Sequence, residues 1–280
     1  MRNLLLNVVV MTVMAAMPVL SQAAASDTAS PRVGVVVMHG KGGSPKFMVA
    51  GLANYLRDNG CLVANLEMPW SGRRKYDVSV NDAVNEVKVA LDVLRQQGAQ
   101  RLFVAGHSQG GLFAFYFAGK HKVDGLIAIA PGGSVANKVF RENLYEPVER
   151  ARSLIAQGKG NEKAVFSDWE NAKGLFDVST TAAIYLDWFD PEGAMNQPKA
   201  VESVIPGVPI LYIVPERDYP GLIRVQAQML SLMPKNSGNK LYEPNATHTG
   251  APTASKEEIL RWITEIAVNN RSNNATLIQE

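Results

Sequence analysis

A pentapeptide with a serine at its centre is the segment of this chain best suited to chemistry. Gly106 to Gly110 read Gly-His-Ser-Gln-Gly and stand between a short apolar run, residues 102–105, and an apolar helical stretch, residues 110–118. This order predicts a strand, a sharp turn and a helix, with Ser108 at the tip of the turn in a strained backbone. The flanking glycines avoid a steric clash where the strand and the helix pass closely. The pattern therefore predicts a nucleophilic hydroxyl that stands clear of the sheet.

A serine hydroxyl needs a histidine base to react at neutral pH. The chain has four histidines. His107 lies inside the turn and is expected to point away from the serine hydroxyl, His39 ends the first predicted strand, and His121 lies between two lysines. His248 remains, in a loop between the last predicted strand and the last predicted helix, from which its ring can reach over the edge of the sheet. We therefore predict that His248 is the base.

A carboxylate should orient this histidine, on a loop that follows a strand and precedes His248 in the chain. Asp218 meets both conditions, because it follows the predicted strand that ends at residue 214. Glu216 is the main alternative, and Asp187 and Asp190 in the preceding segment are weaker ones. We favour Asp218 as the orienting carboxylate.

Acyl transfer also needs N–H donors for the negatively charged oxygen of the tetrahedral intermediate. The backbone N–H of Gln109 directly follows the serine at the start of a predicted helix, where the helix dipole favours negative charge. A second donor is expected from the glycine-rich segment 39–43, and Lys41 and Gly42 are the two candidates. Their backbone can approach a substrate closely because glycines surround them.

The elements that must position these residues alternate between strand and helix. Short apolar runs predict the strands, and amphipathic stretches between them predict the helices. The predicted strands are residues 33–38, 61–66, 102–105, 126–130, 209–214 and 240–242, and the predicted helices are residues 47–58, 80–97, 110–118, 222–232 and 256–268. This alternation predicts an α/β fold, with a mainly parallel sheet of about six strands and helices on both faces.

Residues 132–206 interrupt the alternation with mixed helical stretches, many aromatic residues and no clear buried strand. We predict a helical cap insertion over the carboxyl ends of the strands, where open α/β sheets bind their ligands. Its aromatic side chains can line an apolar acyl pocket, although such residues more often fill a core. They include Trp169, Phe176, Tyr185, Trp188 and Phe189.

The first 25 residues are typical of a secretory signal peptide, because Arg2 precedes an almost uncharged apolar stretch, residues 4–20, and small residues follow it. Cleavage is expected after Ala25, or alternatively after Ala23, and leaves one domain over residues 26–280. The stretch is short and interrupted for a membrane span. We therefore expect an exported protein, periplasmic or secreted, without a stable membrane anchor after cleavage.

Composition and charge argue against several classes of function. The formal net charge is +2 and charges of both signs are mixed along the chain, so nucleic-acid binding is not expected. No cluster of metal-ligand residues stands out, and we expect no metal. Cys61 is the only cysteine, so no disulfide can form within the chain. It opens a predicted strand and is expected to be a small buried side chain rather than a nucleophile.

The chain resembles the α/β-hydrolase superfamily over nearly all of its predicted mature length. The likeness rests on the His-Gly pair at residues 39–40, the serine turn, and the order serine, aspartate, histidine along the chain. It implies a catalytic triad of Ser108, His248 and Asp218, an oxyanion hole formed by the donors named above, and a cap between the fourth and fifth strands. The first two strands of the full superfamily sheet are missing from this pattern.

The resemblance implies a serine hydrolase that cleaves a carboxylic ester, or a related acyl bond, through an acyl-enzyme on Ser108. Such an enzyme needs a small-molecule acyl substrate and no cofactor. An acyl thioesterase or an acyltransferase with the same triad is an alternative, because the fold and the triad do not encode the leaving group. A non-catalytic exported binding protein on the same scaffold is a further alternative.

Overall fold

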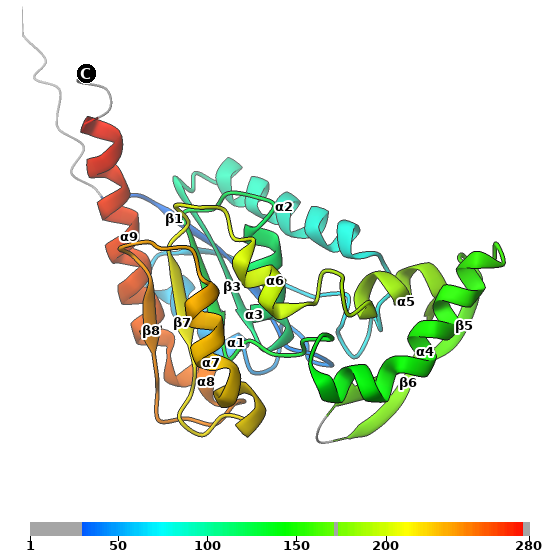
Figure 1. Cartoon of the computed structure of the whole chain (residues 1–280). Helices are drawn as coiled ribbons and strands as arrows, with labels where there is room; N and C mark the ends of the chain where they lie inside the picture. Colours follow the sequence, from blue (N-terminus) through cyan, green and yellow to red (C-terminus); the bar gives the residue numbers. More distant parts are fainter. Residues whose placement is uncertain (1–29, 171–172, 277–280) are drawn as a thin grey trace, which may run out of the picture.

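In the computed structural model, which describes residues 30–170 and 173–276, six strands form a parallel sheet at the centre of the protein (Figure 1). The strands are β1 (Val33–Met38), β2 (Leu62–Leu66), β3 (Arg101–His107), β4 (Gly125–Ile129), β7 (Ile210–Ile213) and β8 (Lys240–Tyr242). They pair in the order β2-β1-β3-β4-β7-β8. All six predicted strands are confirmed, and the fold is the predicted α/β class.

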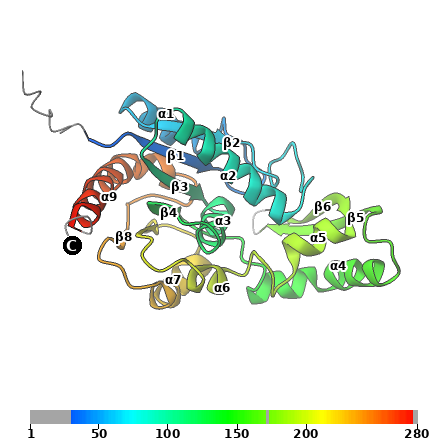
Figure 2. The same ribbon diagram turned by 90° about the horizontal axis from the view of Figure 1, so that it is seen from above.

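Helices cover both faces of this sheet, as Figure 2 shows from above. They are α1 (Ala50–Asp58), α2 (Val80–Gln96), α3 (Gln109–Ala118), α6 (Gln197–Glu202), α7 (Pro220–Leu232), α8 (Ala251–Ala254) and α9 (Lys256–Thr276). Alternate side chains of β1 show the layering: Val36 and Met38 pack in the core with α2 and α3, whereas Val35 and Val37 pack with α1 and α9. The sheet is therefore buried on both faces, which explains its continuous apolar strands.

Local signals place the long helix α2 where the sequence predicts it. The Ser79 hydroxyl accepts a hydrogen bond from the N–H of Asp82, and the Asp82 carboxylate accepts one from the N–H of Ser79. This reciprocal cap satisfies two donors that the first turn of a helix leaves unpaired. The apolar side chains that recur at helical spacing along α2 are buried, as expected of an amphipathic helix: Val84, Val87, Leu91 and Leu94.

The segment after β4 differs from the predicted helical insertion. It contains α4 (Lys138–Ala156), β5 (Lys163–Glu170), β6 (Gly174–Thr181) and α5 (Ala182–Phe189), and β5 and β6 form an antiparallel hairpin. The sequence hides this hairpin because apolar residues lie on both of its faces: Val165 and Leu175 are exposed, whereas Phe166 and Val178 are buried. These four elements lie together on one side of the main sheet in both views (Figures 1 and 2), and we call them the cap.

The cap is also shorter than the predicted residues 132–206. Helix α6 packs against α3 and α7 of the main body. The backbone N–H of Ile205 donates to the carbonyl of Ala118 at the end of α3. Residues 197–206 therefore belong to the layer of helices on the sheet rather than to the cap.

The predicted signal peptide, residues 1–25, lies outside the described residues. Across residues 30–170 and 173–276, no helix combines the length and the apolar character that a membrane crossing requires.

Candidate active site

Ser108 occupies a sharp turn between β3 and α3, as the pentapeptide predicts. Its backbone has φ 54° and ψ −118°, a conformation that is rare for a residue with a side chain. Ser108 stands at the N-terminus of α3, yet its hydroxyl makes no capping hydrogen bond to the helix. The hydroxyl is therefore available to react.

Asp218 and His248 lie together at the carboxyl end of the sheet. His248 Nδ1 is 2.7 Å from Asp218 Oδ1, and both side chains are buried. Because a carboxylate only accepts, Nδ1 carries the proton, and Nε2 of the neutral imidazole is free to accept one. The Asp218 oxygen also accepts a hydrogen bond from the N–H of Tyr219 at 2.7 Å. This arrangement suits a general base that is held by a buried carboxylate.

The backbone beyond β7 and β8 holds these two residues side by side. The N–H of Glu216 donates to the carbonyl of Pro244 at 3.0 Å, and the N–H of Arg217 donates to the carbonyl of Ala246 at 3.1 Å. The strand pairing therefore continues into the loops that carry the aspartate and the histidine. Asp218 and His248 are 30 residues apart in the sequence, and the pairing of neighbouring strands brings them together.

The alternative carboxylates lie elsewhere. Glu216 is exposed on the loop. Asp187 Oδ2 accepts a hydrogen bond from the N–H of Val80 at 2.6 Å, at the start of α2. Asp190 pairs with Arg152 at 3.1 Å. Of the four carboxylates considered from the sequence, Asp218 alone contacts His248 in the described structure.

The other two histidines near the site have structural partners. His107 Nε2 donates to the carbonyl of His248 at 2.9 Å, so it fixes the loop of the candidate base. His39 Nδ1 donates to the carbonyl of Gly40 at 2.7 Å, and its Nε2 accepts from the N–H of Met68 at 3.0 Å. Burial lowers the pKa of His39. Both rings therefore hold loops at the carboxyl edge of the sheet.

One of the two expected oxyanion donors in the glycine-rich segment is already hydrogen-bonded within the protein. The N–H of Gly42 donates to the carbonyl of Trp70 at 2.8 Å, so it is not free to bind a substrate oxygen. Within the described residues, the N–H groups of Lys41 and Gln109 have no backbone or side-chain acceptor. Of the two candidates in the glycine-rich segment, Lys41 is thus the one whose N–H has no acceptor among the described residues.

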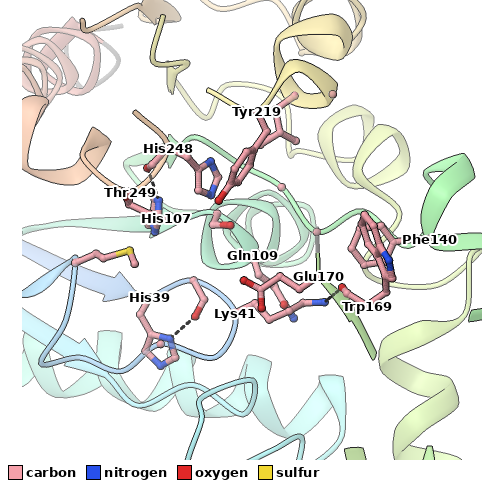
Figure 3. A pocket seen from close by; sticks show the side chains of 18 of the residues that line it. His39, Lys41, His107, Gln109, Phe140, Trp169, Glu170, Tyr219, His248 and Thr249 are labelled. Atoms are coloured by element: carbon pink, nitrogen blue, oxygen red, sulfur yellow. Dashed lines mark hydrogen bonds between the residues drawn. The ribbon is translucent and has the colours of Figure 1, made fainter. Parts of the chain in front are cut away.

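A cavity of about 270 Å³ lies above the serine turn. Ser108, Gln109, Lys41 and His248 line it, so all the remaining candidate residues except the buried Asp218 border one space. Figure 3 shows His248 and Tyr219 on one side of the cavity and Lys41, Phe140 and Trp169 on the other. Seven of the side chains in the wall are aliphatic or aromatic. These apolar side chains are Phe47, Met48, Val139, Phe140, Trp169, Tyr219 and Leu222.

The aromatic residues of the cap divide between the cavity and the core. Trp169 lines the cavity and packs edge to face against Phe140 at 5.1 Å between ring centroids. Tyr185, Trp188 and Phe189 are buried in the core instead. The cavity also contains Phe140 and Glu170, which the sequence did not single out, and Asp168 lies beneath its wall as the partner of Lys41.

Cys61 is buried, as expected for a small side chain at the start of a strand. Burial raises the pKa of its thiol to about 11. The thiolate is therefore disfavoured near neutral pH, which is consistent with a structural rather than a reactive cysteine.

His107→Gln is expected to reduce the loss of folding stability at acidic pH. Burial and the neighbouring His248 lower the pKa of His107 to about 4 from an ordinary value of 6.5. The unfolded chain therefore binds a proton at this histidine as the pH falls below 6.5, whereas the folded protein does not. In the wild type, this difference should lower the free energy of unfolding by about 3 kcal/mol between pH 6.5 and pH 4. Glutamine keeps an N–H donor and does not titrate.

The free energy of unfolding in urea at pH 7 and at pH 4.5 tests this prediction. The loss between the two pH values should be smaller in His107→Gln than in the wild type, while other titrating groups contribute equally to both. An identical loss in the two proteins would show that His107 takes up a proton in the folded state.

Comparisons with known proteins agree with this fold. A carboxyl esterase from Bacillus coagulans is 18% identical with a TM-score of 0.59, covering 86% of this chain and 92% of that chain. A monoacylglycerol lipase from Paleococcus ferrophilus is 21% identical with a TM-score of 0.56, covering 86% and 97%. Est1E from Butyrivibrio proteoclasticus, solved with bound ferulic acid, is 14% identical with a TM-score of 0.58, covering 87% and 92%. At these identities the likeness shows a shared fold.

None of the curated proteins that were compared matches this sequence. The profile of the family described as serine aminopeptidase, S33, matches residues 29–170, just over half of the 280 residues, and this range includes β1, the serine turn and β5, the first strand of the cap hairpin. The chain therefore belongs to the S33 serine aminopeptidase-like family of α/β hydrolases.

Proposed function

We propose that this hydrolase cleaves carboxylic esters through an acyl-enzyme on Ser108. The observation that carries the proposal is the hydrogen bond between Asp218 and His248, because it leaves the second imidazole nitrogen free in the cavity that Ser108 also lines. A strained serine, an oriented base and two free backbone donors are the parts that acyl transfer requires.

In the proposed mechanism, Nε2 of His248 takes the proton of the Ser108 hydroxyl as the oxygen attacks the ester carbonyl. The carboxylate of Asp218 stabilises the imidazolium that forms. The N–H groups of Lys41 and Gln109 bind the oxyanion of the tetrahedral intermediate, and each donor lowers the barrier by roughly 3 kcal/mol.

The intermediate collapses when the bond between the carbonyl carbon and the alcohol oxygen breaks, and His248 gives its proton to the departing alcohol. Water then attacks the acyl-enzyme with the same histidine as base. This second step releases the carboxylic acid and restores the serine hydroxyl.

The aliphatic and aromatic part of the cavity wall favours an ester with an apolar or aromatic acyl group. Aliphatic and aromatic side chains from the main body and from the cap surround the serine, and such walls bind apolar groups of matching size. Proteins of similar fold include a carboxyl esterase, a monoacylglycerol lipase and a protein solved with ferulic acid, and these names support an ester as the substrate class.

A fluorophosphonate probe tests the nucleophile directly. The wild type should form a covalent adduct on Ser108, detected by mass spectrometry of a proteolytic digest, and Ser108→Ala should form none. Ser231→Ala, which removes an exposed serine on α7, should label like the wild type. Absence of an adduct on Ser108 in the folded wild type would overturn the proposal.

Nitrophenyl esters of increasing acyl length, with a matched thioester series, then define the bond that is cleaved. We expect hydrolysis of the esters by the wild type and none by Ser108→Ala. Faster release from the thioesters would identify a thioesterase, and capture of the acyl group by an added alcohol in preference to water would identify an acyltransferase. Turnover of none of these substrates, with unchanged ligand affinity in Ser108→Ala, would favour the non-catalytic alternative.

A further inference from the structure

A buried carboxylate of the cap lies against the proposed oxyanion hole. Asp168, on β5, has a fully buried side chain. Its Oδ1 is 2.6 Å from Nζ of Lys41, and its Oδ2 accepts a hydrogen bond from the hydroxyl of Tyr76 at 3.1 Å. One aspartate thus connects the cap hairpin to the glycine-rich loop after β1 and to the loop that precedes α2.

Both residues that offer a free N–H to the oxyanion reach this cluster with their side chains. Lys41 pairs with Asp168 directly. The hydroxyl of Tyr76 lies 3.3 Å from Oε1 of Gln109, so the tyrosine contacts the aspartate and the second donor residue at once. The backbone of the oxyanion hole is therefore bordered by a side-chain network whose central member belongs to the cap.

The ammonium group of Lys41 depends on this aspartate for compensation of its charge. The lysine side chain is only 11% exposed. Its Nζ lies 4.9 Å from the ring centroid of Phe140 and 5.9 Å from that of Phe189, and it also donates to the carbonyl of Trp169 at 3.3 Å. A largely buried ammonium group that loses its carboxylate partner is strongly disfavoured. We therefore expect the Lys41 side chain to move toward solvent and to displace the backbone of the glycine-rich segment with it.

The backbone around Tyr76 is strained, which also indicates that the cap holds this part of the network in place. Lys75 and Tyr76 have φ values of 52° and 59°, two successive residues with side chains in the left-handed region. Such a conformation persists only where its surroundings hold it, and the carbonyl of Tyr76 accepts a hydrogen bond from Thr180 of β6 at 2.8 Å. The cap hairpin therefore holds the strained loop as well as the lysine.

We infer that Asp168 is a positioning residue for the oxyanion hole: it fixes the N–H of Lys41 through the ion pair and supports Gln109 through Tyr76. This inference rests on the proposed function, since it concerns the donors that serve Ser108. It gives the cap a role in the chemical step, in addition to lining the cavity.

The kinetics of Asp168→Asn test this role against Asp177→Asn, a matched change at an exposed position of β6 in the same hairpin. With a nitrophenyl ester that the wild type hydrolyses, Asp168→Asn should lower kcat by about 10- to 100-fold with KM within about threefold, because small misplacement of catalytic groups has effects of this size. The inhibition constant of a trifluoromethyl ketone, whose adduct places an oxyanion in the same hole, should rise in proportion. Asp177→Asn should match the wild type.

Tyr76→Phe keeps the ring and removes only the hydroxyl, so this second variant tests the same network if Asp168→Asn does not fold. It should lower kcat by about tenfold, the size of one lost hydrogen bond to a charged group. Wild-type kcat in both variants, or a loss confined to KM, would overturn the inference and leave the serine hydrolase proposal intact. Failure of the wild type to label at Ser108 would overturn the proposed function and this inference together.

Discussion

Replacing His248 with glutamine is expected to lower kcat for an ester substrate by about 10⁵- to 10⁶-fold, the size of effect seen when a triad member is removed from a serine hydrolase. In the proposed mechanism the serine hydroxyl then has no base, while the cavity and the two proposed oxyanion donors remain. The residual rate should still exceed that in water by about 10³-fold or more, since those donors and the bound geometry still act. Steady-state kinetics with KM measured separately test this prediction.

Ser108→Ala should lose as much activity as His248→Gln, and the double variant should lose no more than either, because the two residues act as one unit. Asp218→Asn should reduce kcat by about 10⁴-fold, since an amide no longer holds the imidazole in the required tautomer. Two matched controls are available. Glu216→Gln removes an exposed carboxylate from the same loop, and His121→Gln removes a histidine that does not line the cavity.

Both control variants should retain wild-type rates. More than a hundredth of wild-type activity in His248→Gln across the pH range would show that another group takes the proton, and the mechanism proposed here would be wrong. Loss of activity in Glu216→Gln but not in Asp218→Asn would assign the acid to the alternative that the sequence left open.

The sheet and the serine turn were predictable because both leave local marks in the sequence. A strand that is buried on both faces needs a continuous apolar run, as in Val33–Met38, and the turn needs glycines at two fixed positions. Chain order and elimination were enough to select Asp218 and His248, which the structure brings into contact.

The cap and the hydrogen bonding of the glycine-rich segment 39–43 were harder to predict because they depend on contacts between distant residues. Apolar side chains on both faces of the hairpin obscure its alternation, and Asp168 places a charge on the inward face. The choice between Lys41 and Gly42 depends on the carbonyl of Trp70, which occupies one of the two N–H groups. The one local hint was a lysine in the glycine-rich loop, whose partner nothing in the sequence identifies.

Gly106→Ala is expected to destabilise the protein by about 4 kcal/mol or more, or to prevent folding. A Cβ built at Gly106 would lie 2.0 Å from the carbonyl oxygen of Gly110, 2.2 Å from its carbonyl carbon and 2.6 Å from the nitrogen of Gly111. All three are backbone atoms of α3, so no rotation of a side chain can relieve the overlap. The helix would have to move away from β3. The urea dependence of unfolding measures the loss.

Gly51→Ala is the matched control, because it adds the same methyl group in α1, where the nearest atom outside the helix backbone is the Thr253 hydroxyl at 3.9 Å. It should leave stability unchanged or raise it by roughly 0.5–1 kcal/mol, the helix preference of alanine over glycine. Equal stability of Gly106→Ala and the wild type would mean that α3 can shift away from β3. Since α3 begins at the residue after Ser108, a shifted helix would also displace the Gln109 N–H, so such a variant should still lose kcat.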